Sequence, residues 1–234
     1  MTKESNPNHG YLIPSETKGL SPAARTLVER GLSFIVEKQI DYAYTLISEG
    51  DKAGAVQQLR EALNITPWNA GARFNLAELL LGMGDFAAAI EEYREVVRVE
   101  PDDDIAHMYF GIALLMHTED FLSAISEFRE VIRLEPDNAY AHSWLGEALM
   151  KSGDLQGAIA AYQESARLKP GYVYSHLGLG QALRAAGEWE GASIEFYQVL
   201  FLAKEKERDF SSYKQETEIA RNGLRDMGMS DEIN

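Results

Sequence analysis

A repeat of about 34 residues is the feature of this sequence that most constrains its fold. Four segments end in a proline, and these prolines are spaced at steps of 34, 35 and 34 residues, at Pro67, Pro101, Pro136 and Pro170. An alanine recurs in step with them, at Ala55, Ala89, Ala124, Ala158 and Ala192. Self-similarity at this period is typical of proteins that stack copies of one structural unit around a continuous core. The chain is therefore expected to fold as a stack.

Each repeat is predicted to consist of two helices joined by a tight turn. A small residue lies 12 or 13 positions before each repeated alanine and is followed by a leucine three positions later. A bulky apolar residue follows the alanine by four positions. These spacings place apolar side chains on one face of a helix. Turn segments such as Ser48–Asp51 supply a glycine for the helix end and an acid for the start of the next helix.

This pattern of small residue, central alanine, bulky apolar residue and terminal proline resembles the tetratricopeptide repeat (TPR) family. The resemblance implies an all-α fold, a right-handed superhelical α-solenoid of helix-turn-helix repeats. The fifth repeat departs from the pattern, because Lys204 stands where the others have proline. Five repeats fit, at 36–69, 70–103, 104–138, 139–172 and 173–206.

The flanking segments are predicted to cap the stack. Ser21 and Pro22 are a typical helix start, so residues 21–35 are expected to form a leading helix with a break at Gly31. Residues 207–227 carry an apolar stripe and are expected to form a capping helix over the last repeat. Flexible ends are predicted at residues 1–20 and 228–234.

A peptide-binding groove is implied by the resemblance, because the first helices of such repeats line a concave face. The groove positions of the family are the second, fifth, ninth, twelfth and thirteenth of each repeat. An apolar stripe rimmed by charge is typical of a partner site. The alternative is that these side chains pack between neighbouring first helices, as Leu81, Leu115 and Leu177 would do. The candidate peptide-binding residues are Ile40, Tyr44, Phe74, Asn75, Ile105, Met108, Ile112, Tyr140, Met150 and Tyr174.

The groove lacks most of the lysines and asparagines that would bind a peptide's terminal carboxylate, and this indicates which type of peptide to expect. The best-known binding mode of this family clamps a terminal carboxylate between lysines and asparagines. Here Ile40 and Tyr44 occupy the first pair of positions, and Asn75 alone remains of the pattern. A hydrophobic segment or an amphipathic helix is the expected ligand instead. The chain contains one such segment itself, Tyr11–Pro14, which could fold back into the groove or pack locally.

Composition excludes several function classes. The 234 residues include 22 Lys and Arg against 37 Asp and Glu, a net charge of −15, which disfavours nucleic acid and anionic membranes as partners. The absence of cysteine removes thiolate metal sites and cysteine nucleophiles. We therefore expect no cofactor and no metal. The first twenty residues lack a secretory apolar region and no run is long enough to enter a membrane, so a cytoplasmic location is predicted.

A histidine recurs at the same place in three repeats, at His107, His142 and His176. Neighbouring helices lie roughly 8–10 Å apart whereas zinc holds nitrogen at about 2.0–2.1 Å, so these residues are not expected to share one metal ion. Either they pack between the helices or they make the packing sensitive to pH.

The sequence as a whole predicts a non-catalytic interaction module. The residues outside the repeats are too few for a catalytic domain. We expect a scaffold that binds a protein or peptide in its groove, acting as an assembly factor or a chaperone-like adaptor. The alternative is a homo-oligomer that buries the groove in self-association.

Overall fold

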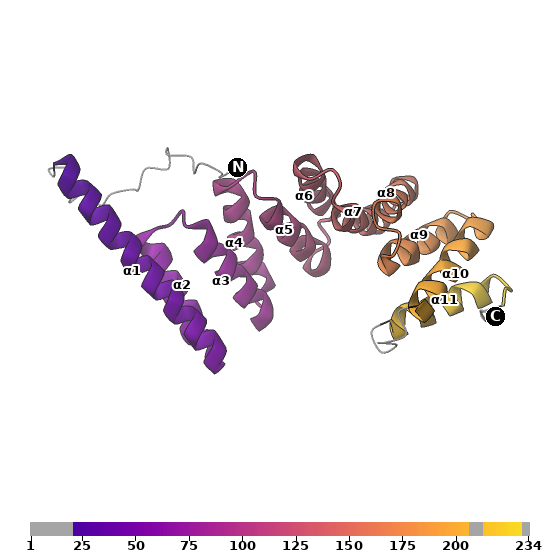
Figure 1. The fold of residues 1–234 in the computed structure, drawn as a ribbon, viewed down its shortest axis with the longest axis horizontal. Helices are drawn as coiled ribbons and strands as arrows, with labels where there is room; N and C mark the ends of the chain where they lie inside the picture. The colour runs from indigo at the N-terminus through magenta and orange to yellow at the C-terminus, as the bar shows by residue number, and fades with distance from the viewer. Residues whose placement is uncertain (1–20, 206–212, 231–234) are drawn as a thin grey trace. The chain divides into compact units, whose positions relative to one another are not determined.

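The computed structural model describes residues 21–205 and 213–230, and over these ranges the chain is entirely helical (Figure 1). The all-α fold expected from the repeat is thereby confirmed. The chain forms two compact units, residues 1–101 and 102–234, referred to below as the N-terminal and C-terminal units. None of the helices in the described ranges is long and apolar enough to cross a membrane.

The N-terminal unit contains four helices, each packed against the next in sequence: α1 (Pro22–Glu49), α2 (Lys52–Ile65), α3 (Ala70–Met83) and α4 (Phe86–Val99). The Ser21 side chain caps α1 by accepting from the amide of Ala24. The predicted break at Gly31 is wrong, since α1 continues through it. One interior glycine weakens a helix by only about 1 kcal/mol relative to alanine, and that is too little to interrupt a capped helix of this length.

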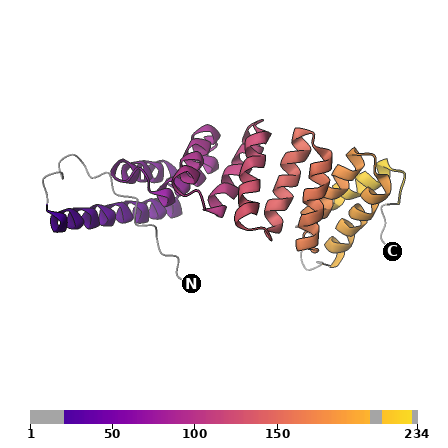
Figure 2. The same ribbon diagram turned by 90° about the horizontal axis from the view of Figure 1, so that it is seen from above.

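The C-terminal unit continues the helical pairs and has seven helices in its described part: α5 (Asp104–His117), α6 (Phe121–Leu134), α7 (Ala139–Ser152), α8 (Leu155–Leu168), α9 (Val173–Ala185), α10 (Trp189–Glu205) and α11 (Lys214–Asp226). The first helices of its repeats, α5, α7 and α9, lie next to one another, while α6 and α8 each pack against the first helix that follows (Figure 2). We call the face built by α5, α7 and α9 the inner face.

Helix ends are fixed by the turn residues that the sequence pattern singled out. Asp154 begins α8 by accepting a hydrogen bond at 2.9 Å from the amide of Gly157. Gly153 ends α7 with a φ of 90°, a conformation that side chains disfavour. The third repeat has no glycine at this turn, and Thr118 ends α5 in extended backbone instead.

Large aromatic side chains on the second helices form the centre of the core. The rings of Tyr93, Phe128, Tyr162 and Phe196 are almost fully buried. Tyr162 lies between glycines of two first helices, and a Cβ added at Gly146 or Gly178 would lie 2.9 or 2.3 Å from its ring. The small residues of the repeat therefore admit these rings, and the rings fix the spacing of the helices.

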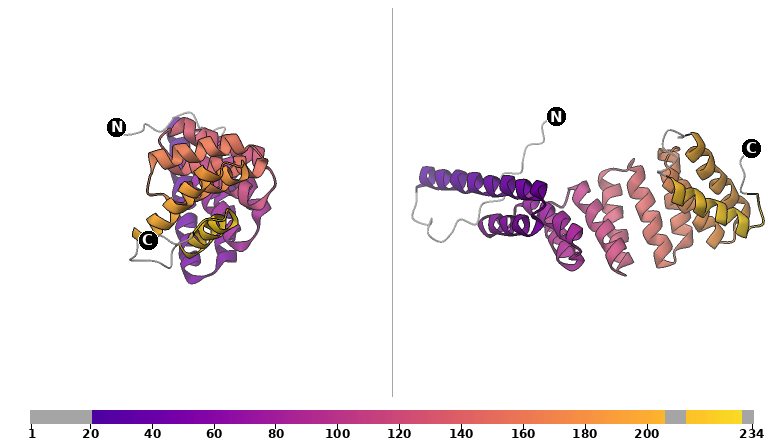
Figure 3. Two further views of the ribbon diagram at one scale, coloured as in Figure 1. Left: turned by 90° about the vertical axis from the view of Figure 1, so that its right-hand side faces the viewer. Right: turned by 90° about the horizontal axis from the view of Figure 1, so that it is seen from below.

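The last helix, α11, covers the end of the fifth repeat (Figure 3). It packs against α10 and α9, and its Gly223 admits the ring of Phe196 in the way that Gly178 admits Tyr162. An ion pair at 2.9 Å joins Arg184 of α9 to Asp226 of α11. The helix lies within the predicted capping segment 207–227, of which residues 207–212 fall outside the described ranges.

Candidate functional site

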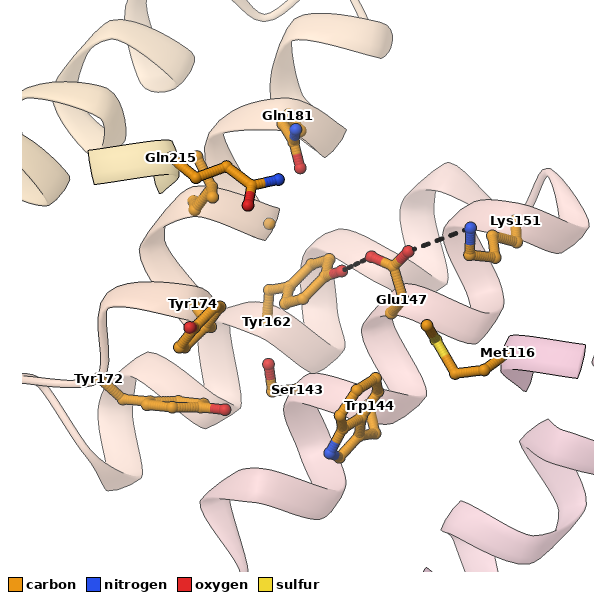
Figure 4. A pocket seen from close by; sticks show the side chains of 12 residues that line it. Met116, Ser143, Trp144, Glu147, Lys151, Tyr162, Tyr172, Tyr174, Gln181 and Gln215 are labelled. Atoms are coloured by element: carbon orange, nitrogen blue, oxygen red, sulfur yellow. Dashed lines mark hydrogen bonds and ion pairs between the residues drawn. The ribbon is translucent and has the colours of Figure 1, made fainter. Parts of the chain in front are cut away.

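A pocket of about 620 Å³ opens on the inner face of the C-terminal unit (Figure 4). Its lining combines aromatic rings with amide, hydroxyl and charged groups, and comes mainly from α7 and α9. The lining residues are Met116, Ser143, Trp144, Glu147, Lys151, Tyr162, Tyr172, Tyr174, Leu177, Gly178, Gln181 and Gln215. Such a mixture of apolar walls and a few convergent polar groups is typical of a binding site.

Helix α7 supplies the polar side of the pocket. Ser143, Glu147 and Lys151 follow one another at intervals of four residues, which places them on one face of the helix. The indole of Trp144 lies beside them, across the pocket from Tyr172 and Tyr174 (Figure 4). A single helical face thus presents a hydroxyl, a carboxylate and an ammonium to the same space.

Glu147 is the central charged group of this arrangement. The hydroxyl of Tyr162 donates to Oε2 of Glu147 at 3.0 Å, and Nζ of Lys151 lies 3.4 Å from Oε1. Burial, reinforced by the adjacent carboxylate, raises the pKa of Tyr162 far above its ordinary value. Tyr162 therefore stays protonated and remains a donor to Glu147.

A cluster of tyrosines forms the opposite wall. The ring of Tyr172 meets that of Tyr140 edge-on, with centroids 5.0 Å apart, and lies 5.5 Å from that of Tyr174. Burial and the neighbouring tyrosines raise the pKa of Tyr172 to about 12. Burial and a hydrogen bond with Glu216 of α11 raise the pKa of Tyr174. Tyr172 and Tyr174 are therefore uncharged over the whole physiological range.

A lysine contacts two rings of this cluster. The ammonium of Lys169 lies 4.2 Å from the ring centroid of Tyr140 and 5.6 Å from that of Tyr172, and it donates to the hydroxyl of Tyr140. Both distances fall within the range of cation–π attraction. The tyrosine cluster thus already holds one cation supplied by the chain.

The structure brings together some of the candidate residues of the C-terminal unit. Tyr174 lines the pocket with 45% of its surface exposed, and Tyr140 contributes through its contact with Tyr172. Met150 is half-buried on α7 and does not line the pocket. The three candidates on α5 share one face of that helix, outside the pocket lining: Ile105, Met108 and Ile112.

The candidates of the N-terminal unit do not line this pocket and differ among themselves. Ile40 packs against the core cluster around Leu59 and Leu76. Phe74 meets the buried ring of Tyr93 edge-on at 5.6 Å. The remaining two, Tyr44 and Asn75, are exposed and half-buried respectively.

Three leucines at groove positions pack in the core, as the alternative to a binding role predicts. Leu115 and Leu177 are 3% and 7% exposed, and Leu81 packs against the core cluster of the N-terminal unit. Leu177 also reaches the pocket wall, so one side chain serves both the core and the site. The apolar stripe read from the sequence is therefore a mixture of core and surface.

The sequence reasoning missed most of the pocket. The groove positions of the repeat include four polar residues that line the pocket: Ser143 at the fifth place, Glu147 and Gln181 at the ninth and Lys151 at the thirteenth. These residues were left out because an apolar groove was sought. Trp144, Tyr172 and Gln215 carried no signal in the repeat pattern, since they lie at other positions or beyond the repeats.

Two of the recurring histidines, His107 and His176, link the two helices of their repeat, and none of the three lines the pocket. Nδ1 of His107 lies 2.6 Å from Glu127, and Nε2 of His142 lies 3.0 Å from the carbonyl of Pro136. His176 makes both types of contact, to Glu195 at 2.7 Å and to the carbonyl of Pro170 at 2.9 Å. Among the described residues, no group of three or more histidines or acids is placed to hold a metal ion. The segment Tyr11–Pro14 lies outside the described ranges.

Comparison with known families gives a consistent result along the chain. Models of the tetratricopeptide repeat match residues 46–108, 115–173 and 149–200, which together make up more than half of the chain. A search of curated proteins found no match.

Solved structures of tetratricopeptide-repeat proteins are similar in fold. A crystal structure of MamA is 25% identical with a TM-score of 0.67, over 71% of this chain and 96% of that one. MamA from Desulfovibrio magneticus is 20% identical with a TM-score of 0.68, over 73% and 96%. YrrB, described as a TPR protein with an unusual peptide-binding site, is 15% identical with a TM-score of 0.66, over 83% and 98%.

Proposed function

The chain belongs to the tetratricopeptide-repeat family, and on that basis we propose that it is a non-catalytic module that binds a peptide segment of a partner protein on the inner face of its C-terminal unit. The pocket between α7 and α9 carries this proposal. It is large enough for one or two side chains, and its aromatic walls offer contact area at a low cost in side-chain entropy.

The groups that line the pocket suit a peptide better than a small apolar ligand. Ser143, Gln181 and Gln215 offer both hydrogen-bond donors and acceptors in the pocket lining, as a peptide backbone requires. Trp144 and Tyr174 offer rings for anchoring side chains, the residue types that dominate binding energy at interfaces. The peptide-binding site for which YrrB is described supports the view that this fold can serve such a role.

The experiment is a selection from a displayed peptide library against the full chain, followed by calorimetric titration of the selected peptides. We expect Tyr174→Ala to weaken binding about 10-fold or more, because an anchoring ring is removed. Trp189→Ala is the control, since Trp189 is a comparably exposed aromatic residue, 54% accessible, that does not line the pocket. It should leave the affinity unchanged within about twofold.

Two kinds of outcome would refute this proposal. One is that no peptide is selected, or that Tyr174→Ala and Trp189→Ala have the same effect. The other is that light scattering shows a stable dimer of the native chain, that Tyr174→Ala abolishes this dimer, and that added peptides do not compete with dimer formation. The second outcome would make the inner face a self-association surface, the alternative function considered from the sequence.

A further inference from the structure

We propose that the pocket between α7 and α9 is specific for an arginine side chain of the bound peptide, with Glu147 as its ion-pair partner and the rings of Tyr172 and Tyr174 as its walls. This inference rests on the proposed function and defines its ligand. It differs from the expectation of an apolar segment, because the central group of the pocket is a carboxylate.

Glu147 is available to such a ligand. Its side chain is 31% exposed, and the Tyr162 hydroxyl engages one carboxylate oxygen. The other oxygen meets Lys151 at 3.4 Å, a loose contact for an ion pair, and Lys151 itself is 41% exposed. A guanidinium that enters the pocket can take over this oxygen at a shorter distance, while Lys151 swings into solvent.

The walls favour a flat cation. Lys169 shows that the tyrosine cluster attracts a positive charge, since its ammonium lies over the ring of Tyr140 and near that of Tyr172. Two rings of this cluster, those of Tyr172 and Tyr174, line the pocket (Figure 4). Guanidinium groups stack on aromatic rings and form forked hydrogen bonds with carboxylates, which an ammonium cannot do.

The charges around the pocket also favour a cationic ligand. Glu216 of α11, hydrogen-bonded to the Tyr174 hydroxyl, adds a second carboxylate at the tyrosine wall of the pocket. Of the two nearby lysines, Lys169 is engaged with the tyrosine cluster, whereas Lys151 pairs loosely with Glu147 and competes with a guanidinium for it. With a net charge of −15 on the whole chain, the long-range field also attracts a basic segment and repels an acidic one.

A simpler explanation of Glu147 is that it only satisfies the buried Tyr162 hydroxyl. The N-terminal unit contains the same pairing, in which the Tyr93 hydroxyl donates to Glu78. Where the buried ring is Phe128 or Phe196, the ninth position of the repeat holds Ile112 or Gln181 in place of glutamate. Glu78 therefore provides a control that shares the structural role of Glu147 without lining this pocket.

The test uses N-acetyl-arginine amide as the probe and N-acetyl-citrulline amide, which has the same shape without the charge, as its control. Titrations into the full chain would be followed by nuclear magnetic resonance at the indole N–H of Trp144. We expect the arginine probe to bind at least about 5-fold more tightly than the citrulline probe. Glu147→Gln, which keeps an acceptor for Tyr162, should abolish this preference, and Glu78→Gln should not change it.

A third variant separates recognition from a structural effect. Lys151→Met removes the cation that competes for Glu147, so it should strengthen arginine binding by about 2-fold or more, whereas a merely structural role for the pair predicts no gain. Equal binding of both probes by the native chain, or a preference that survives Glu147→Gln, would overturn the inference. If selected peptides still bind and remain sensitive to Tyr174→Ala, that result leaves the proposed function standing.

Discussion

His176 illustrates how single residues connect the repeats. Its two ring nitrogens face two acceptors, the carboxylate of Glu195 and the carbonyl of Pro170, so both contacts are satisfied together when the ring is protonated. Burial disfavours the charged ring, but the hydrogen bonds with Glu195 and Pro170 outweigh it and raise the pKa of His176. At the equivalent place in the second repeat, Arg73 makes the same two contacts, to Glu92 and Pro67, with a group that stays charged.

Stability is therefore expected to depend on pH through His176. Its pKa is raised in the folded state, so its contribution is fully present below the ordinary value of about 6.5 and is lost as the pH rises through the folded-state pKa. His176→Arg should flatten this dependence and retain on the order of 1 kcal/mol more stability at about pH 9 than the native chain. Urea unfolding at several pH values measures the difference. Parallel curves for the two proteins would contradict this assignment.

Gly178 tests the packing of the buried rings. A methyl group at this position would lie 2.3 Å from the ring of Tyr162, which packs between Gly146 of α7 and Gly178 of α9. Gly178→Ala is expected to destabilise the chain by about 2–3 kcal/mol. Gly31→Ala is the control, since nothing lies within 4 Å of the added carbon, and it should stabilise α1 by roughly 0.5–1 kcal/mol. Thermal unfolding distinguishes the two, and equal effects would show that the ring can yield.

At the scale of the elements, the start of α9 departs from the other first helices. Asn69, Asp103 and Asn138 each cap their helix by accepting from a backbone amide, whereas Tyr172 at the corresponding place makes no side-chain cap and lines the pocket instead. A missing cap costs about 1 kcal/mol. This repeat thus forgoes local stability at a position where its side chain serves the site.

Restoring the cap should separate stability from binding. In Tyr172→Asn, the new cap offsets the lost ring contacts, so the free energy of unfolding should change by less than about 1 kcal/mol. Peptide affinity should fall about 10-fold, because one wall of the pocket is removed. Calorimetric titration and urea unfolding of the same sample measure both quantities. Unchanged affinity would exclude Tyr172 from the site.

The helices themselves were largely predictable from the sequence. Turn glycines such as Gly153 and capping acids such as Asp154 act within a few residues of the helix ends they define, so local pattern suffices to locate them. The break expected at Gly31 was wrong, because the expectation gave a single glycine too much weight. A glycine changes helix stability by a small amount, and the good cap at Ser21 together with the length of α1 decides the outcome.

At the scale of the whole molecule, the candidate site was only partly predictable. The groove positions of the repeat include Tyr174, which lines the pocket, and they also cover Glu147 and Gln181 once polar residues are admitted. From α11, beyond the last repeat, Gln215 lines the pocket and Glu216 hydrogen-bonds Tyr174, and no periodic pattern predicts how a capping helix lies. Periodicity therefore finds the face, and side-chain contacts between distant segments decide where on that face a ligand can bind.

The most direct test of the proposed function is hydrogen exchange, followed by mass spectrometry, of the full chain with and without a selected peptide. We expect added protection in two segments, residues 143–151 of α7 and residues 172–181, which run from Tyr172 into α9. These two segments supply most of the pocket lining. The second helices α6 and α8 should exchange as before. Protection confined to those second helices, or to the N-terminal unit, would contradict the claim that the inner face of the C-terminal unit is the binding site.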